Sequence, residues 1–250
     1  MKPPIKKKWG QNFINDKNII NKIISVFNPN KNDTILEIGP GRGALTIPLS
    51  KISKEIIAIE IDPMLCKILN EHNFEKIKIT NDDILNYDLS SLSKGYKIIG
   101  NLPYYITTPI IFKFLNNINW VKMTIMVQKE VANRIIAKPG NKNYGRLSIM
   151  IQAYSSITQH FNISPNLFEP KPKVDSTVIS IKPKPIKIMN PNLFYTIVKL
   201  AFQKRRKMLK NSLSEYLTNE QINKYGHIRP EKISVNDFIN ISDSCINVKN

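Results

Sequence analysis

Cysteine is scarce in this sequence: its 250 residues contain only Cys66 and Cys245, which stand far apart. The three histidines are scattered as well. A disulfide framework or a zinc site needs such residues in larger number or at short spacing. This composition excludes a small disulfide-stapled fold, and we expect no metal. Two unpaired thiols indicate a reducing compartment, so we expect a cytoplasmic protein.

Long apolar runs are also missing. None approaches the roughly 18 residues that a membrane-spanning helix needs. The first residues, Met1 to Lys8, are basic rather than apolar, so we expect neither a signal peptide nor a membrane partner. Hydrophobic residues make up 42% of the chain, which is ordinary for a globular protein. We therefore expect one large domain with a smaller one attached, and a monomer.

Acidic residues are few compared with basic ones. Nineteen aspartates and glutamates stand against 37 lysines and arginines, which gives a formal net charge of +18. Such a field attracts polyanions and makes association depend on salt, so it favours a nucleic-acid partner. The abundance of Lys, Asn and Ile also fits an A+T-rich genome, which would raise the lysine content without selection for binding.

Strands and helices alternate along most of the chain. An apolar stripe predicts a first helix that starts at Asn15 or Asp16 and runs to Phe27. The elements expected next are strands 34–38, 55–60, 76–80, 97–100 and 121–127, and helices 44–52, 63–72, 108–117 and 129–137. This alternation is typical of an α/β protein with a parallel, doubly wound, Rossmann-like sheet.

The remaining sequence predicts the end of the sheet and a second domain. We expect a helix near 145–155 and strands near 157–163 and 173–182, the two strands as an antiparallel edge. Pro183-Lys184-Pro185 is a stiff breaker. The expected division is a domain of residues 1–185, whose residues 1–14 form a basic mobile segment, and a small helical domain of residues 186–250 with helices near 191–203 and 205–217.

A glycine-rich loop follows the first strand of the sheet. In Glu37-Ile38-Gly39-Pro40-Gly41-Arg42-Gly43-Ala44, glycines permit a tight turn and the close approach of a ligand to the main chain. Glu60 ends the second strand, about 20 residues later, where a carboxylate can accept hydrogen bonds from both hydroxyls of a ribose. The same spacing fits the dinucleotide fingerprint, so this loop alone leaves an NAD-dependent dehydrogenase open.

Three further features favour a cationic nucleoside as the ligand. Glu37 lies just before the loop, where a carboxylate suits a cation better than a pyrophosphate. Asp82, Asp83 and Ile84 follow the third strand, where they can bind an adenine amine and cover its ring. Capping of a turn is the alternative role for one of the two aspartates. A ligand with adenine, ribose and a positive centre but no phosphate is S-adenosylmethionine.

The motif Asn101-Leu102-Pro103-Tyr104 closes the strand 97–100. Asn101 offers a side-chain oxygen that can accept a hydrogen bond from an exocyclic amine. Pro103 fixes the backbone so that the Leu102 carbonyl can point the same way. Tyr104 supplies a face on which a flipped base can stack. The alternative is an ordinary loop with a half-buried tyrosine.

Five motifs, in order along the chain, resemble those of the KsgA (RsmA) type of rRNA adenine N6-dimethyltransferase. They are Lys8-Trp9-Gly10-Gln11-Asn12-Phe13, Glu37-Ile38-Gly39-Pro40-Gly41, Asn101-Leu102-Pro103-Tyr104, Pro172-Lys173-Val174-Asp175-Ser176 and Ala201-Phe202-Gln203-Lys204-Arg205-Arg206-Lys207. The resemblance implies a Rossmann-like S-adenosylmethionine-dependent methyltransferase domain with a small α-helical C-terminal domain. It implies dimethylation of two adjacent adenosines in the 3′-terminal hairpin of small-subunit (16S) rRNA, within an immature 30S particle.

The resemblance also implies roles for single residues. The cofactor residues would be Asn12 and Ile14 over the methionine end, Gly39 and Gly41 along the cofactor, Glu60 at the ribose, and Asp83 with Ile84 at the adenine. Asn101 and the Leu102 carbonyl would act on the target amine, with Tyr104 and Phe168 flanking the base. Trp9 departs from the family, where phenylalanine is commoner, and Tyr105 follows the motif as a second tyrosine.

A basic run near the C-terminus is the expected RNA contact. It comprises Lys204, Arg205, Arg206, Lys207 and Lys210, in a region expected to be helical. A solvated helix face is the alternative. Two other functions stay open: an erythromycin-resistance methylase acting on 23S rRNA, and an assembly factor whose binding to the subunit matters more than methylation.

Overall fold

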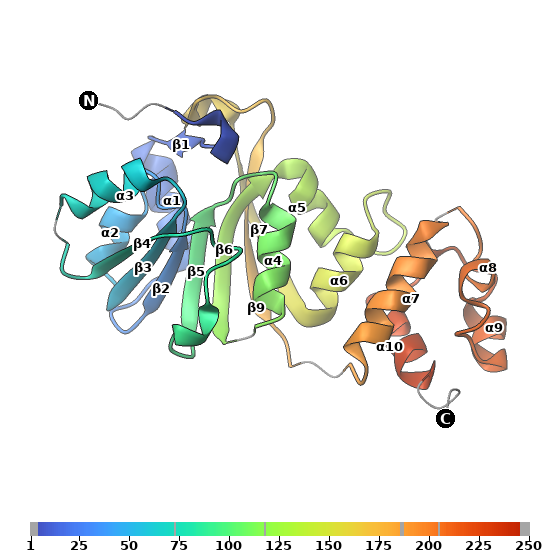
Figure 1. The fold of residues 1–250 in the computed structure, drawn as a ribbon. Coiled ribbons are helices and arrows are strands. Elements are labelled where there is room, and N and C mark those ends of the chain that lie inside the picture. The colour runs from blue at the N-terminus through green and yellow to red at the C-terminus, as the bar shows by residue number, and fades with distance from the viewer. Residues whose placement is uncertain (1–4, 73, 118, 186–187, 205, 246–250) are drawn as a thin grey trace. The chain divides into compact units, whose positions relative to one another are not determined.

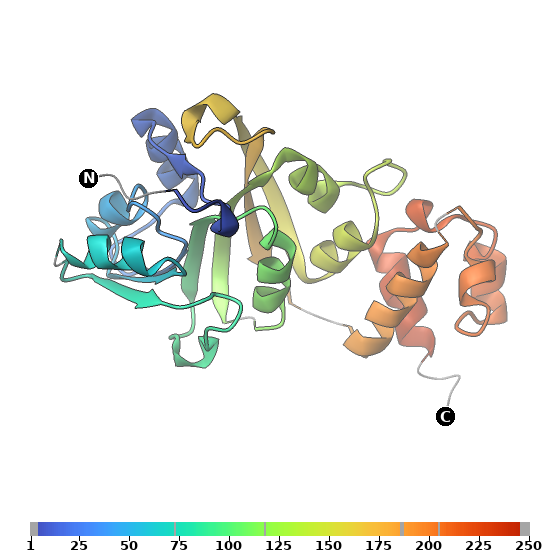
Figure 2. The same cartoon turned by 45° about the horizontal axis from the view of Figure 1, so that its top comes forward.

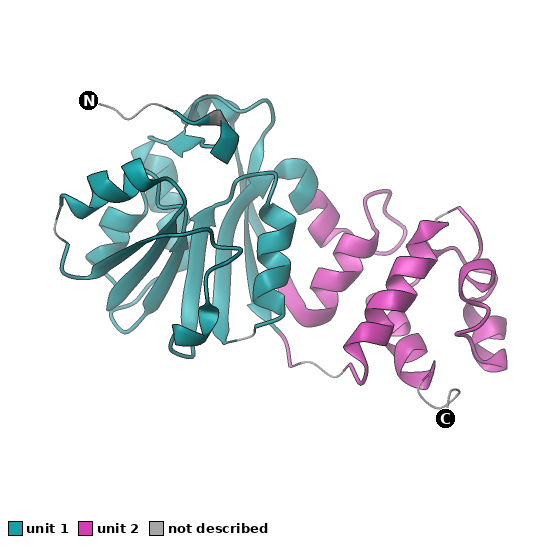
Figure 3. Ribbon diagram, in the orientation of Figure 1, with its two compact units in different colours: residues 1–132, 158–183 teal, residues 133–157, 184–250 magenta. Residues whose placement is uncertain are grey.

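The computed structural model describes residues 5–72, 74–117, 119–185, 188–204 and 206–245. The chain divides into two compact units, residues 1–132 with 158–183 and residues 133–157 with 184–250 (Figure 3). One division point lies at Pro183, within the proline-containing breaker. Residues 133–157 group with the C-terminal helices rather than with the sheet, which differs from the expected division.

A mixed sheet of seven strands forms the centre of the first unit in the described part of the chain (Figure 1). Its order is β4 (Ile77–Asn81), β3 (Glu55–Glu60), β2 (Thr34–Ile38), β5 (Tyr96–Asn101), β6 (Trp120–Gln128), β9 (Ser176–Pro183) and β7 (Ser155–Ile163). The first five are parallel, and β9 is antiparallel to β6. The α/β class expected from the alternating pattern is confirmed.

The chain changes direction across the sheet between β2 and β5. From β2 it proceeds outward to β3 and β4, then returns to β5 on the other side of β2 and continues to β6. Loops after β2 and β5 therefore diverge, and a crevice opens beyond their carboxyl ends. The register aligns Ile38 with Gly100, which places the glycine loop and Asn101 at the same edge.

Helices connect the parallel strands. They are α1 (Lys17–Phe27) before β2, α2 (Thr46–Ser50), α3 (Pro63–Asn70) and α4 (Thr107–Leu115). The expected start of the first helix is confirmed, because the Asp16 carboxylate accepts a hydrogen bond from the Ile19 amide (2.8 Å). Helix α2 is shorter than the expected helix 44–52, since the glycine loop turns until Leu45.

The N-terminal residues cross the edge of the sheet where the parallel strands end (Figure 2). A short 3₁₀ helix (Lys7–Trp9) precedes β1 (Phe13–Ile14), which pairs with β8 (Phe168–Glu169). The side chains of Lys6 and Gln11 both donate to the Asp62 carboxylate, at 2.8 and 2.9 Å. The expectation of a mobile segment over residues 1–14 is thus corrected for residues 6–14, because these bonds and the β1–β8 pair hold them. Residues 1–4 lie outside the described residues.

The second unit is helical. Its helices are α5 (Lys129–Ile136), which starts in the first unit, α6 (Arg146–Tyr154), α7 (Pro191–Gln203), α8 (Lys210–Leu213), α9 (Asn219–Tyr225) and α10 (Val235–Ser244). The buried Tyr144 hydroxyl donates to the Ile233 carbonyl (3.0 Å) and ties two segments of this unit together. No helix in the described part of the chain has both the length and the apolarity needed to span a bilayer.

The expected helix 205–217 is wrong. Among the described residues of this range, only the four of α8 are helical. Lys204, Arg206 and Lys207 lie in the turn between α7 and α8. The amides of Leu209 and Lys210 donate to the carbonyls of Ile228 (2.8 Å) and Gly226 (3.1 Å), so contacts distant in the chain determine this segment. Arg205 lies outside the described residues.

Candidate functional site

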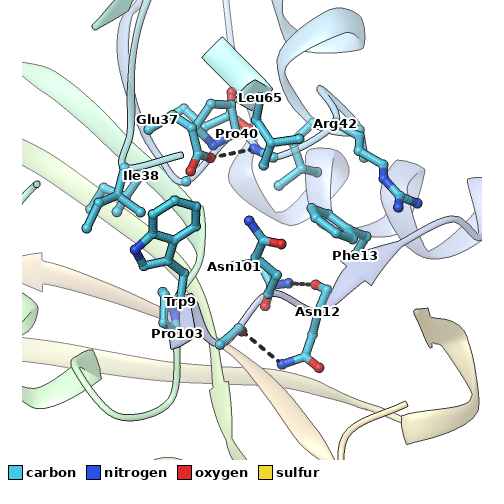
Figure 4. Close-up of a pocket in the computed structure, with 18 of the residues that line it drawn as sticks. Trp9, Asn12, Phe13, Glu37, Ile38, Pro40, Arg42, Leu65, Asn101 and Pro103 are labelled. Atoms are coloured by element: carbon cyan, nitrogen blue, oxygen red, sulfur yellow. Dashed lines mark hydrogen bonds between the residues drawn. The ribbon is translucent and has the colours of Figure 1, made fainter. Parts of the chain in front are cut away.

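A cavity of about 420 Å³ lies at the carboxyl ends of β2 to β5, beneath the N-terminal segment. Figure 4 shows Asn101, Glu37, Phe13 and Trp9 around it. All of the residues expected to bind the cofactor line it: Asn12, Ile14, Gly39, Gly41, Glu60, Asp83, Ile84 and Asn101. The structure therefore brings together side chains that are separated by as much as 89 positions in the chain.

The glycine loop forms one wall of the cavity. Gly41 has a positive φ of 60°, which favours glycine, and its amide donates to Glu60 Oε2 (3.0 Å). A Cβ at this position would lie 3.0 Å from the Phe13 ring. Glycine at position 41 thus allows Phe13, from the N-terminal segment, to close against the loop.

Glu60 is fixed before any ligand binds. Its two oxygens accept from the Asp62 amide (2.9 Å) and the Gly41 amide (3.0 Å), and its side chain is buried. Burial raises the pKa of Glu60, and the two amide hydrogen bonds oppose that rise. Each carboxylate oxygen keeps a further lone pair with which it can accept a hydroxyl.

Glu37 is the most unusual acidic group of the cavity. Only 1% of it is exposed, and no hydrogen-bond partner among the described residues reaches its Oε2. Burial, with the nearby Glu60 carboxylate adding to it, raises the pKa of Glu37 to about 8. A buried acidic side chain at a cavity wall, one of whose own oxygens has no hydrogen-bond partner among the described residues, suits a cationic ligand.

The turn after β4 supplies the next wall. The Asp82 carboxylate accepts from the Asp83 amide (2.7 Å), and the Asp83 carboxylate accepts from the Leu85 amide (2.9 Å). Both aspartates therefore stabilise the turn, and both also line the cavity. Lys113 holds the turn from α4, because its ammonium donates to the carbonyls of Leu85 (2.8 Å) and Tyr87 (2.7 Å).

The orientation of the Asn101 amide follows from its partner. Its Nδ2 donates to the carbonyl oxygen of Asn12 (2.6 Å), and a carbonyl can only accept (Figure 4). The amide oxygen is therefore the group of Asn101 that remains to accept a hydrogen bond in the cavity. Gly100 permits this placement, since a Cβ there would lie 2.7 Å from the Ile38 carbonyl oxygen of the neighbouring strand.

Three expected catalytic residues are not among those that line the cavity. Leu102 is buried beside the motif, and its amide donates to the Met126 carbonyl (3.2 Å). Tyr104 is half-buried, and its hydroxyl shares a hydrogen bond with Ser176 Oγ (2.7 Å). Phe168 is buried in the apolar cluster that includes Ile14, its partner across the β1–β8 pair, so it supports the cavity wall from behind.

Sequence reasoning gave no role to several residues that line the cavity. Trp9, Gln11, Arg42, Tyr105 and Met126 are among them. Four of these five lie within or beside a motif, so proximity to the motifs was the available signal. For Met126 the sequence offers no such signal. This residue lies within an apolar strand and reaches the site because β6 pairs with β5, where Met126 lies opposite Asn101.

Two solved structures share the fold. A dimethyladenosine transferase from Plasmodium falciparum aligns with a TM-score of 0.81 and 23% identity, covering 92% of this chain and 95% of its own. The 23S rRNA methyltransferase ErmE aligns with a TM-score of 0.73 and 24% identity, covering 92% and 99%. These alignments agree with the sheet order and the glycine loop at the strand ends. The fold is therefore that of a Rossmann-like methyltransferase with a helical C-terminal part.

Sequence comparison gives the family. The family model described as "Ribosomal RNA adenine dimethylase" matches residues 4–246, and the chain belongs to this family. A relative from Wigglesworthia glossinidia brevipalpis, named "Ribosomal RNA small subunit methyltransferase A", is 44% identical over 98% of this chain and 99% of its own. One of the same name from Caldanaerobacter subterraneus is 39% identical over 96% of each. The family resemblance of the motifs is confirmed. Membership of this family also excludes the NAD-dependent dehydrogenase that the glycine loop alone left open.

Proposed function

We propose that this protein transfers methyl groups from S-adenosylmethionine to N6 of two adjacent adenosines in the 3′-terminal hairpin of small-subunit rRNA. The relatives named for small-subunit rRNA support the choice of RNA. The observation that carries the chemistry is the Asn101 amide, whose nitrogen is bound by Asn12 so that its oxygen remains as an acceptor in the cavity. The substrate would be rRNA in an immature 30S particle, and the enzyme would act as a monomer.

The cavity fits the proposed cofactor. Glu37 is a buried acid with an orphaned oxygen, which suits a positive charge, and Glu60 is a fixed acceptor for ribose hydroxyls. Asp83 and Ile84 would hold the adenine, with Ile14 closing the methionine end. When bound, S-adenosylmethionine would supply a methyl group on a sulfonium, which is a good methyl donor because the group left after transfer is a neutral thioether.

Asn101 would prepare the target amine. The lone pair of an adenine amine is delocalised into its ring, which makes the nitrogen a weak nucleophile. Hydrogen bonds from the amine to the Asn101 oxygen and the Leu102 carbonyl favour a more tetrahedral nitrogen and expose the lone pair. The same two acceptors hold the amine in line for attack. A second transfer requires the monomethyl amine to rotate, so the pocket must tolerate a methyl group.

Aromatic side chains would hold the flipped base. Tyr104 would offer a ring face beside Pro103, and its hydroxyl bond to Ser176 would restrict the ring to one position. Phe168 would act through Ile14, against which it packs.

Exposed cations of the second unit would hold the phosphate backbone. Lys204, Arg206 and Lys207 are exposed in the turn between α7 and α8, and Lys210 begins α8. Together with Arg205, they would contribute the salt-dependent part of RNA binding.

The test is methylation of under-methylated small subunits with labelled S-adenosylmethionine, followed by mapping of the modified nucleotides. We expect N6,N6-dimethyladenosine at two adjacent positions near the 3′ end of the small-subunit rRNA. Purified large-subunit rRNA serves as the competing substrate. Label found there, and not in the small subunit, would overturn the proposed substrate in favour of the 23S alternative.

A further inference from the structure

Two aromatic side chains stand at the mouth of the cavity without a role in the mechanism above. Trp9 and Tyr105 both line it, and Tyr105 is 59% exposed. Gly10 has a φ of +62°, which favours glycine, and its backbone lies beside the Tyr105 ring: a Cβ there would be in van der Waals contact with Cε1 of that ring, at 3.4 Å. Trp9 and Tyr105 are therefore brought to one rim by two segments that are far apart in the sequence.

Two lysines add positive charge to this rim. The ammonium groups of Lys6 and Lys8 lie 4.5 and 4.4 Å from the centroid of a Trp9 ring. Lys6 is also paired with Asp62, whereas the Lys8 residue is exposed. Lysines beside an aromatic ring are a combination that binds single-stranded nucleic acid. A base can stack on the ring when it displaces the ammonium group from the ring face, and the displaced charge then attracts the phosphate.

The rim carries lysines, whereas most of the ionisable side chains that line the cavity are acidic. Glu37 and Glu60 are buried acids, and Asp82 and Asp83 line the cavity with them. The interior thus favours a cation, while the rim favours a base with its phosphate. One cavity with two such regions suits a cationic cofactor inside and a polyanionic chain at its mouth.

We propose that Trp9 and Tyr105, with Lys8 beside them, hold the nucleotide that adjoins the target adenosine. This inference rests on the proposed function and assigns the neighbouring base a place that Tyr104 does not supply. Tyr104 is already assigned to the target base, and its hydroxyl bond to Ser176 restricts its ring to that one position. In this arrangement the target base would reach Asn101 inside the cavity, while the neighbouring base stacks on the exposed Tyr105 ring and the half-buried Trp9 ring.

The first test is a series of substitutions at Tyr105, assayed with under-methylated small subunits. Tyr105→Phe keeps the flat face, Tyr105→Leu keeps most of the apolar volume, and Tyr105→Ala removes both. We expect Phe to behave as the original residue. Leu and Ala should raise KM for the RNA substrate by roughly 5- to 100-fold, the range expected for one lost stacking contact. Turnover at saturating RNA and cofactor affinity should stay within about twofold.

The results separate this inference from the proposed function. Failure of the unsubstituted protein to methylate small subunits would reject the function itself. Normal methylation with the same KM for RNA in all three variants would reject the proposed stacking on Tyr105 and leave the proposed function intact. Equal effects of Phe, Leu and Ala would also reject it, because stacking requires that Phe be spared.

The second test uses the fluorescence of Trp9. The chain has two tryptophans, and the other, Trp120, is 3% exposed with its indole bound to the Phe114 carbonyl (2.7 Å). A short RNA hairpin with two adjacent unpaired adenosines should quench the emission, with S-adenosylhomocysteine present throughout. Trp9→Phe should abolish the change, and a fully paired duplex should cause little. An unchanged emission at RNA concentrations that saturate binding would overturn the assignment of Trp9.

Discussion

Substitution of Glu37 by glutamine should remove a pH dependence from cofactor binding. The pKa of Glu37 is about 8 in the cofactor-free protein, so only about a tenth of the molecules carry the charge at pH 7, and about nine tenths at pH 9. A cation prefers the ionised form, and the apparent Kd is the intrinsic Kd divided by the competent fraction. Affinity of the unsubstituted protein should therefore rise about tenfold between pH 7 and pH 9.

Calorimetry with S-adenosylmethionine at pH 7, 8 and 9 measures this effect. The ammonium group of the cofactor titrates in the same range, but it does so for both proteins, so the ratio of the two affinities isolates Glu37. Binding at pH 7 should release close to one proton more from the unsubstituted protein than from Glu37→Gln. A ratio that does not change between pH 7 and pH 9 would refute the proposed contact between Glu37 and the cation.

The raised pKa of Glu37 also makes the stability of the folded protein depend on pH. A raised acid pKa means that the folded protein binds its proton more tightly, so stability is greatest below the unfolded pKa and falls as the pH rises towards 8. The shift from 4.5 to about 8 corresponds to at most about 5 kcal/mol. Cofactor-free Glu37→Gln should accordingly melt at a higher temperature than the unsubstituted protein at pH 9, and the gap should narrow at pH 5.

Three other changes have defined outcomes. Glu60→Ala should weaken cofactor binding by about 1–3 kcal/mol, because charge-assisted bonds to the ribose are lost, and an unchanged affinity by calorimetry would remove Glu60 from the site. Gly100→Ala should lower stability by about 1–3 kcal/mol, since the new methyl would meet the Ile38 carbonyl; chemical denaturation measures this, and no loss would contradict the close packing of β5 on β2. Charge reversal at Arg205 and Arg206 should reduce the salt slope of RNA binding by about 0.7–0.9 per lost phosphate contact and leave cofactor affinity intact, whereas an unchanged slope would show a merely solvated turn.

Periodic sequence patterns predicted the fold well. Strands β2 and β3 were expected with the bounds that the structure has, because buried parallel strands are continuous apolar runs such as Ile56–Ile59. Their carboxyl ends must lie at one edge of the sheet. For this reason the residues at the ends of these strands, from Gly39 to Asn101, were expected at one site. They line one cavity together with Asn12 and Ile14, which were expected from the family resemblance alone.

Features set by distant contacts were not predictable. Strands β1 and β8 are two residues each, too short for any periodicity, and they exist through pairing across more than 150 positions. The segment after α7 has the composition of a helix, but bonds from Leu209 and Lys210 to the turn before residue 229 override that propensity. The pairing of Lys6 and Gln11 with Asp62 likewise has no signal in the sequence, because any exposed lysine or glutamine would look the same.

The most direct measurement is single-turnover methylation by Asn101→Ala at saturating RNA and saturating S-adenosylmethionine. Asn101 is proposed to act on the amine as its nitrogen becomes tetrahedral, so its loss should appear in turnover rather than in RNA affinity. Tyr104→Ala is the matched control from the same motif, and saturating RNA should restore much of its activity, because it removes a stacking face and no acceptor. We predict no detectable dimethyladenosine from the Asn101 variant, with its fold and RNA binding retained. Near-normal dimethyladenosine formation by that variant would contradict the mechanism and the reading of residues 101–104 as the active site.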